Sequence, residues 1–152
     1  MIENLGNIGD LIGGVGVIAT LIYLATQIRQ NTSSHRMASI QQIISTSVSI
    51  SLGASAGPIP AIFVKCEKHD RLTEEEFAQF LMFVWAMLTN HWQIFHLYQK
   101  GMIDKEVLDK FMSRLQGTMN MSVARAMWRS RIKHGFPTDY QEYIQQQIEG
   151  DA

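Results

Sequence analysis

A chain of 152 residues is about the size of one domain, or of a membrane anchor followed by a small domain. With 13 basic and 14 acidic residues the net charge is −1, so no overall positive charge favours nucleic acid as a partner. The single cysteine, Cys66, excludes an internal disulfide and fits a reducing compartment. Long segments of helical periodicity, without strand-like alternation, predict an all-α protein.

The first predicted element is a membrane-spanning helix over residues 11–28, a stretch without a formal charge. As a helix it rises ~27 Å, close to the ~30 Å hydrocarbon core of a bilayer. Its Leu, Ile and Val residues contribute about −4 kcal/mol on an insertion scale. A cleaved signal peptide is the alternative. No basic residue precedes the apolar run and no small-residue cleavage pattern follows it, so we expect an uncleaved anchor.

The charges beside this span predict its orientation. Arg29 and Arg36 lie after it, and no Lys or Arg lies before it. Because basic residues favour the cytoplasmic side, we expect the N-terminus outside and residues 29 onward in the cytoplasm.

Small residues recur along one face of the predicted span. Gly6, Gly9, Gly13, Gly16 and Thr20 are spaced 3, 4, 3 and 4 residues apart. In lipid such a stripe, called here the small-residue seam, allows two helix backbones to approach closely. It predicts packing against copies of the same chain or against another membrane protein.

The same spacing continues from Thr20 to Tyr23 and Gln27. If the helices pack around an axis, Thr20 and Gln27 are the predicted lining of a pore.

One motif in the span resembles a nucleotide-binding fingerprint. Residues 14–19 fit G-x-G-x-x-A, which requires a preceding strand and an acidic residue about 20 positions later. No acidic residue occurs between Asp10 and Glu67. We therefore predict no nucleotide and no other cofactor.

An amphipathic helix is predicted over residues 35–56. Its apolar positions recur at helical spacing: Met37, Ile40, Ile43, Ile44 and Val48. Residues 37–64 carry no charge, and Ser and Gln occupy the opposite face. Two interpretations stay open for that face: packing against another polar protein surface, or simple exposure to solvent. Glycine and proline between residues 53 and 60 are predicted to end the helix.

Residues 57–152 are predicted to form a cytoplasmic helical domain, which follows an anchor over 1–34 and the extension over 35–56. A short helix is expected over 59–67, and a capping box, Thr73–Glu76, opens a long helix to about Gln99. That helix is uncharged from residue 77, but its Asn and His residues would be costly in lipid, so we expect a core helix. Further helices are predicted from Asp104 to a break at 117–120, from Met121, and after Pro137.

No catalytic or metal-binding group of residues emerges from the sequence. Cys66 and His69 have no further ligands nearby. His91 and His96 are five residues apart, so they do not share one helix face, and we expect structural histidines. A row of basic residues would face lipid head groups, an acidic partner or solvent: Arg125, Arg129, Arg131 and Lys133. We therefore predict that the chain is not an enzyme.

Three stretches resemble an uncharacterised bacterial family of small membrane proteins. They are TLIYLATQIRQNT at 20–32, YQKGMIDKE at 98–106, and Trp128 followed by Phe136 and a short last helix. The resemblance implies a single N-terminal span, a cytoplasmic helical domain and a place in the bacterial inner membrane, and it implies no activity.

These observations lead to one functional hypothesis and one alternative. The hypothesis is a membrane-anchored protein that self-associates through the small-residue seam into a homo-oligomer, with a pore as one form that it could take. The alternative is an accessory or adaptor subunit, anchored through the same glycines to a larger membrane complex.

Overall fold

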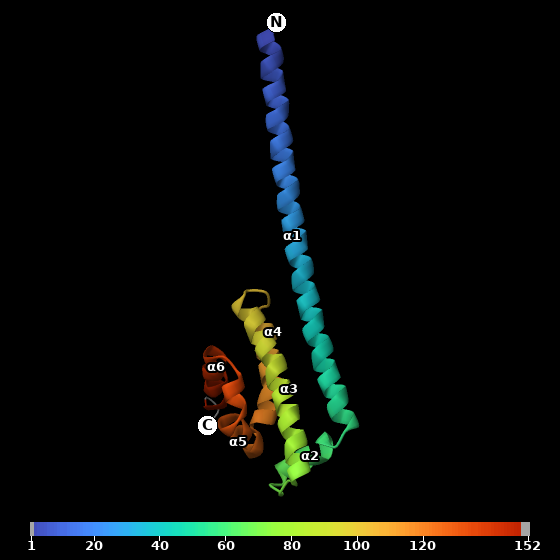
Figure 1. Ribbon diagram of the computed structural model, residues 1–152, viewed down its shortest axis with the longest axis vertical. Helices are drawn as coiled ribbons and strands as arrows, with labels where there is room; N and C mark the ends of the chain where they lie inside the picture. The colour runs from blue at the N-terminus through green and yellow to red at the C-terminus, as the bar shows by residue number, and fades with distance from the viewer. Residues whose placement is uncertain (1, 150–152) are drawn as a thin grey trace. The chain divides into compact units, whose positions relative to one another are not determined.

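The computed structural model describes residues 2–149, with side chains for residues 13–148. Within this range the chain is all-α, as predicted, and contains no strand (Figure 1). Its elements are α1 (Ile2–Ala56), α2 (Ile59–Glu67), α3 (Glu74–Gln99), α4 (Lys105–Met119), α5 (Ser122–Ser130), the 3-10 helix η1 (Ile132–Gly135) and α6 (Thr138–Glu149).

The chain divides into two compact units, Met1–Ser39 and Ile40–Ala152. The described part of the first unit is a single helix, and the polar residues 30–34 do not interrupt it. Its large side chains from residue 15 to 28 are 46–66% exposed: Val15, Val17, Ile18, Leu21, Ile22, Tyr23, Leu24 and Ile28. The first unit therefore presents a nearly continuous apolar surface.

Within the described residues, no helix taken alone has both the length and the apolarity needed to cross a membrane. One bent pair does meet the requirement by length and composition, namely Gly13–Ala56 with Ile59–Glu67, which meet at 79°. The first two residues of the predicted span, Leu11 and Ile12, lie outside the residues whose side chains are described.

Helix α3 forms the centre of the second unit. Phe80, Val84 and Leu88 recur every four residues, so they lie on one face, and each is fully buried. The predicted capping box is confirmed: Thr73 Oγ1 accepts from the Glu76 amide at 3.2 Å, and Glu76 Oε2 accepts from the Thr73 amide at 2.9 Å. These two bonds satisfy backbone donors that the first turn of a helix cannot pair internally.

Helices α4, α5 and α6 complete the core around α3. The fully or almost fully buried residues of these helices are Leu108, Met112, Leu115, Met119, Ala124, Met127, Trp128, Tyr140 and Ile144. The predicted break at 117–120 is wrong at its start, because α4 continues through Gly117 to Met119. The buried side chain of Met119 holds this last turn against the core. The sequence also missed η1, which follows α5 and buries Ile132.

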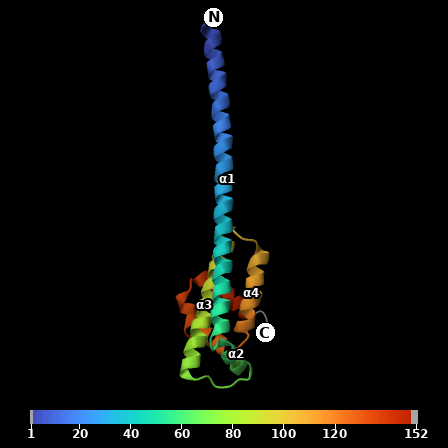
Figure 2. The same cartoon turned by 90° about the vertical axis from the view of Figure 1, so that its right-hand side faces the viewer.

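The C-terminal part of α1 belongs to the second unit and is seen beside α3 and α4 in Figure 2. Its buried face differs from the predicted apolar face. Ile43 and Ser47 are buried, whereas Ile44 and Val48 are 50% and 51% exposed. The face of α1 that is turned inward also carries serines. Their side chains find polar partners on α3 and α4, as described below.

Candidate functional site

The described part of the small-residue seam begins at Gly13, because the side-chain positions of Gly6 and Gly9 lie outside the described residues. A Cβ atom built at Gly13 or Gly16 meets no other atom within 4 Å. The glycines are therefore not required by any contact within the described chain, and a larger side chain fits at either position in the isolated helix.

The polar side chains on this face are hydrogen-bonded within the helix. Thr20 Oγ1 donates to the Gly16 carbonyl at 2.8 Å, and Gln27 Nε2 donates to the Tyr23 hydroxyl at 2.8 Å. Both bonds join residues four positions apart, which places all four residues on one side of α1. Thr20 and Gln27, the predicted pore-lining residues, thus lie on the same side of the helix as Gly16.

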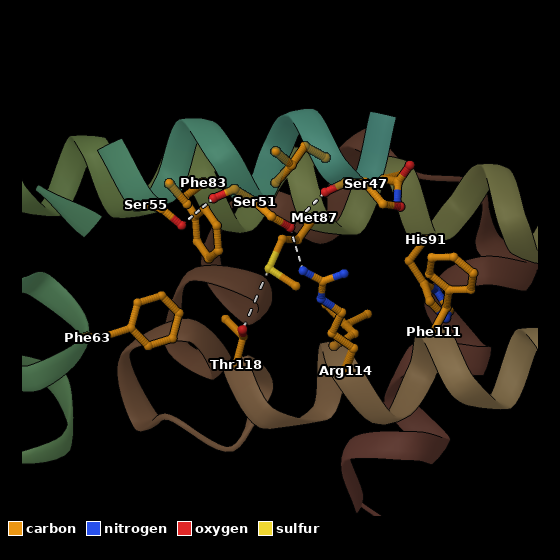
Figure 3. A pocket seen from close by; sticks show the side chains of 14 residues that line it. Ser47, Ser51, Ser55, Phe63, Phe83, Met87, His91, Phe111, Arg114 and Thr118 are labelled. Carbon is orange, nitrogen blue, oxygen red and sulfur yellow. Dashed lines mark hydrogen bonds between the residues drawn. The ribbon is translucent and has the colours of Figure 1, made fainter. Parts of the chain in front are cut away.

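A second candidate site, which the sequence did not predict, is a cavity of about 290 Å³ in the second unit. Residues of α1, α2, α3 and α4 line it (Figure 3). The apolar lining consists of Ile50, Ala54, Phe63, Phe83, Met87, Phe111 and Leu115, and the polar lining of Ser47, Ser51, Ser55, Asn90, His91, Arg114 and Thr118. Three serines spaced four residues apart place one polar row of α1 along this cavity.

Asn90 is the first of two buried polar residues in the lining. Its Nδ2 donates to Ser47 Oγ at 2.7 Å, and only 7% of the residue is exposed. Its Oδ1 is buried and has no hydrogen-bond partner among the described residues. An unpaired buried carbonyl oxygen costs about 1–3 kcal/mol, so the burial of Asn90 Oδ1 lowers the stability of the second unit.

The second buried polar residue of the lining is His91, which is only 2% exposed. Tyr140 donates its one phenolic proton to the Leu88 carbonyl at 3.1 Å. The contact of 3.0 Å between His91 Nδ1 and the Tyr140 oxygen must therefore use a proton on Nδ1. Burial lowers the pKa of His91 to about 4, so at neutral pH the ring is uncharged and Nε2 is an acceptor. That atom is buried and also has no partner among the described residues.

Arg114 is the one charged side chain among the described residues of the lining. It is exposed and donates from Nη2 to Ser51 Oγ, while Ser51 Oγ itself donates to the Ser47 carbonyl at 2.8 Å. Figure 3 shows Arg114 and Thr118 facing the serines of α1, with Met87 between them. The cavity therefore combines a cation, a row of serine side chains and an apolar wall.

The remaining residues singled out from the sequence lie apart from this cavity. Cys66 is buried, and burial together with the nearby charge of Glu76 raises the pKa of its thiol. His69 has a backbone φ of 59° at the end of α2, and His96 is exposed. Among the described residues, no three His, Cys, Asp or Glu side chains gather in a way that could hold a metal ion.

The predicted basic row after Met121 is divided by the fold. Arg129 and Arg131 are exposed, whereas Arg125 and Lys133 are half-buried. Arg125 Nη2 donates to the Asn120 carbonyl at 3.3 Å, which stabilises the turn between α4 and α5.

Comparison of the chain with protein-family models, with curated proteins and with solved structures finds no match. The resemblance to a bacterial membrane-protein family therefore stays an expectation from the sequence.

Proposed function

We propose that this chain is a bacterial inner-membrane protein that self-associates through α1 into a homo-oligomer, with the N-terminus outside and the helical domain in the cytoplasm. The supporting observation is the apolar surface of the first unit, where eight large side chains between residues 15 and 28 are 46–66% exposed. In water this surface would be costly, at roughly 25 cal/mol for each Å² of apolar area. A bilayer together with a neighbouring helix removes that cost.

The polar groups of the same segment are compatible with a lipid environment. Beyond Thr20 and Gln27, the hydroxyls of Thr26 and Thr32 donate to backbone carbonyls within α1, at 2.7 and 2.9 Å. A donor that is paired inside its own helix does not need water. The polar residues therefore oppose insertion of this segment into a membrane less than their number suggests.

The 3, 4 spacing also continues beyond the anchor. From Gln27 it passes the polar residues Gln30, Ser34 and Gln41, and it reaches Met37, Ile44 and Val48, the exposed apolar residues of α1 that the predicted buried face included. A repeat of 3 and 4 residues is the pattern by which helices pack side by side in a left-handed supercoil. Parallel copies of α1 would bury these side chains against each other.

The first experiment is purification of the full chain from membranes in mild detergent, followed by measurement of its mass. We expect the chain in the membrane fraction, resistant to alkaline extraction, and a discrete mass that is a multiple of 17.3 kDa. A monomer, or a stoichiometric complex with a different protein, would contradict self-association, and the second result would support the accessory-subunit alternative.

A pore is a separate question from association. If the homo-oligomer encloses one, replacing Gln27, which lies beyond the small-residue seam, with Leu should change ion flux through reconstituted vesicles without changing the mass of the oligomer. Equal flux through vesicles with and without protein would remove the pore from the proposal.

A further inference from the structure

The cavity of the second unit carries an inference that is independent of self-association. Its volume of about 290 Å³ exceeds the ~150 Å³ that accepts a benzene ring in a protein core. It is therefore large enough for two fused aromatic rings with a short substituent. Phe63, Phe83 and Phe111 supply ring surfaces and Met87 supplies a polarisable sulfur, which favours a flat aromatic guest.

Asn90 and His91 line the same cavity, but their unpaired atoms place no requirement on a guest. Asn90 Oδ1 and His91 Nε2 are buried against the protein itself, so a molecule in the cavity does not reach them.

The charge of the cavity lining sets the second requirement for a guest. Arg114 is the single charged side chain among the described lining residues, and no carboxylate lines the cavity with it. Its planar guanidinium recognises carboxylates through paired N–H donors. Its present partner is a serine hydroxyl, which a carboxylate can replace at little cost.

From these two features, the aromatic lining and the guanidinium, we infer that the cavity binds a small aromatic carboxylate. The carboxylate pairs with Arg114, and the rings lie among Phe63, Phe83 and Phe111. Because the pocket is built from residues between 47 and 118, it belongs to the second unit and not to the first.

The test uses the full chain in lipid nanodiscs and indole-3-acetate as the probe, with empty nanodiscs as the blank for partition into lipid. Titration calorimetry should give saturable binding with one site per chain. Indole-3-ethanol keeps the ring system and removes the carboxylate. We expect it to bind at least ~10-fold more weakly than indole-3-acetate.

The protein variants separate recognition from folding. Arg114→Gln should weaken the binding of indole-3-acetate by ~10-fold or more. It should leave the affinity for indole-3-ethanol unchanged, because only the carboxylate loses its partner. Arg129→Gln is the matched control, since Arg129 is exposed on α5 outside the lining, and it should bind like the wild type. Absence of saturable binding up to millimolar indole-3-acetate, or equal affinity for indole-3-acetate and indole-3-ethanol, would overturn the inference.

Discussion

The side-chain amide of Asn90 donates a 2.7 Å hydrogen bond to the hydroxyl of Ser47, and this bond joins α3 to α1 in the interior of the second unit. Both residues are buried. The face of α1 that is turned inward therefore combines this polar contact with the apolar contacts of Ile43.

Replacing Ser47 with Ala tests this contact. The change leaves Asn90 without its partner, so we expect the free energy of unfolding to fall by about 1–3 kcal/mol. Ser49→Ala is the matched control, because the exposed hydroxyl of Ser49 bonds only to the Ser45 carbonyl of its own helix, and it should stay within ~0.5 kcal/mol of the wild type. Denaturant unfolding of the detergent-solubilised chain measures both. Equal stability of the two variants would show that the Ser47–Asn90 bond does not hold α1.

The buried imidazole of His91 predicts a dependence of stability on pH. Its pKa in the folded chain is about 4, against an ordinary value of 6.5. Below pH 6.5 the unfolded chain binds a proton that the folded chain does not, so the stability is complete above pH 6.5 and is lost as the pH falls toward 4. At ~1.36 kcal/mol per pH unit the loss over this interval is about 3 kcal/mol.

The histidine variants identify the group responsible. His91→Phe should reduce the slope of unfolding free energy between pH 6.5 and 4 by about 1 kcal/mol per pH unit. His96→Phe, at an exposed position of the same helix, should retain the slope of the wild type. The same slope in His91→Phe and the wild type would place the pH dependence on another group.

Two helix ends with the same hydrogen bonds but different residues give a third prediction. After α3, Gly101 has φ 66°, and the Met102 amide donates to the Leu97 carbonyl at 2.9 Å. After α2, His69 has φ 59°, and the Asp70 amide donates to the Lys65 carbonyl at 2.9 Å. This left-handed conformation costs a residue with a side chain about 1 kcal/mol or more, whereas glycine adopts it freely.

Substitutions at Gly101 and His69 should therefore change the stability of the chain in opposite directions. Gly101→Ala is expected to lower the midpoint of thermal unfolding, and His69→Gly to raise it, each through a change of about 1 kcal/mol. A destabilised His69→Gly would mean that the contact of 3.3 Å between His69 Nδ1 and the Cys66 carbonyl outweighs the backbone strain.

Local signals in the sequence were sufficient for most of the helices. The Thr73–Glu76 box and the Gly and Pro residues around 57–60 act through backbone bonds and backbone conformation within a few positions, so α3 and the end of α1 could be predicted from the residues alone. Gly117 was misread because glycine is tolerated inside a helix when a neighbour such as Met119 is held in the core.

The cavity could not be predicted, because it depends on how α1, α3 and α4 pack. The signal was present but ambiguous: a charge-free stretch from residue 37 to 64 was consistent with either a packed or a solvated polar face. Ser47 and Ser51, which bond to Asn90 and Arg114, lie among the predicted apolar positions, whereas Ser45 and Ser49 of the opposite face are exposed. Which face of an amphipathic helix is buried depends on the partner surface, and no local pattern encodes that surface.

The central claim is that copies of α1 associate along the small-residue seam, and three glycines allow a matched test. A Cβ atom at Gly13, Gly14 or Gly16 meets nothing within 4 Å, so larger side chains at these positions leave the helix itself intact. Gly14 lies roughly 100° around the helix from Gly13 and outside the seam.

The decisive measurement is the mass in mild detergent of the wild type, the double variant Gly13→Leu/Gly16→Leu, and the control Gly14→Leu. We predict one shared oligomeric mass for the wild type and Gly14→Leu, and dissociation to monomer in the double variant, because leucine at the seam holds the backbones apart. An oligomer of unchanged mass in the double variant, or dissociation in Gly14→Leu as well, would contradict association through the seam.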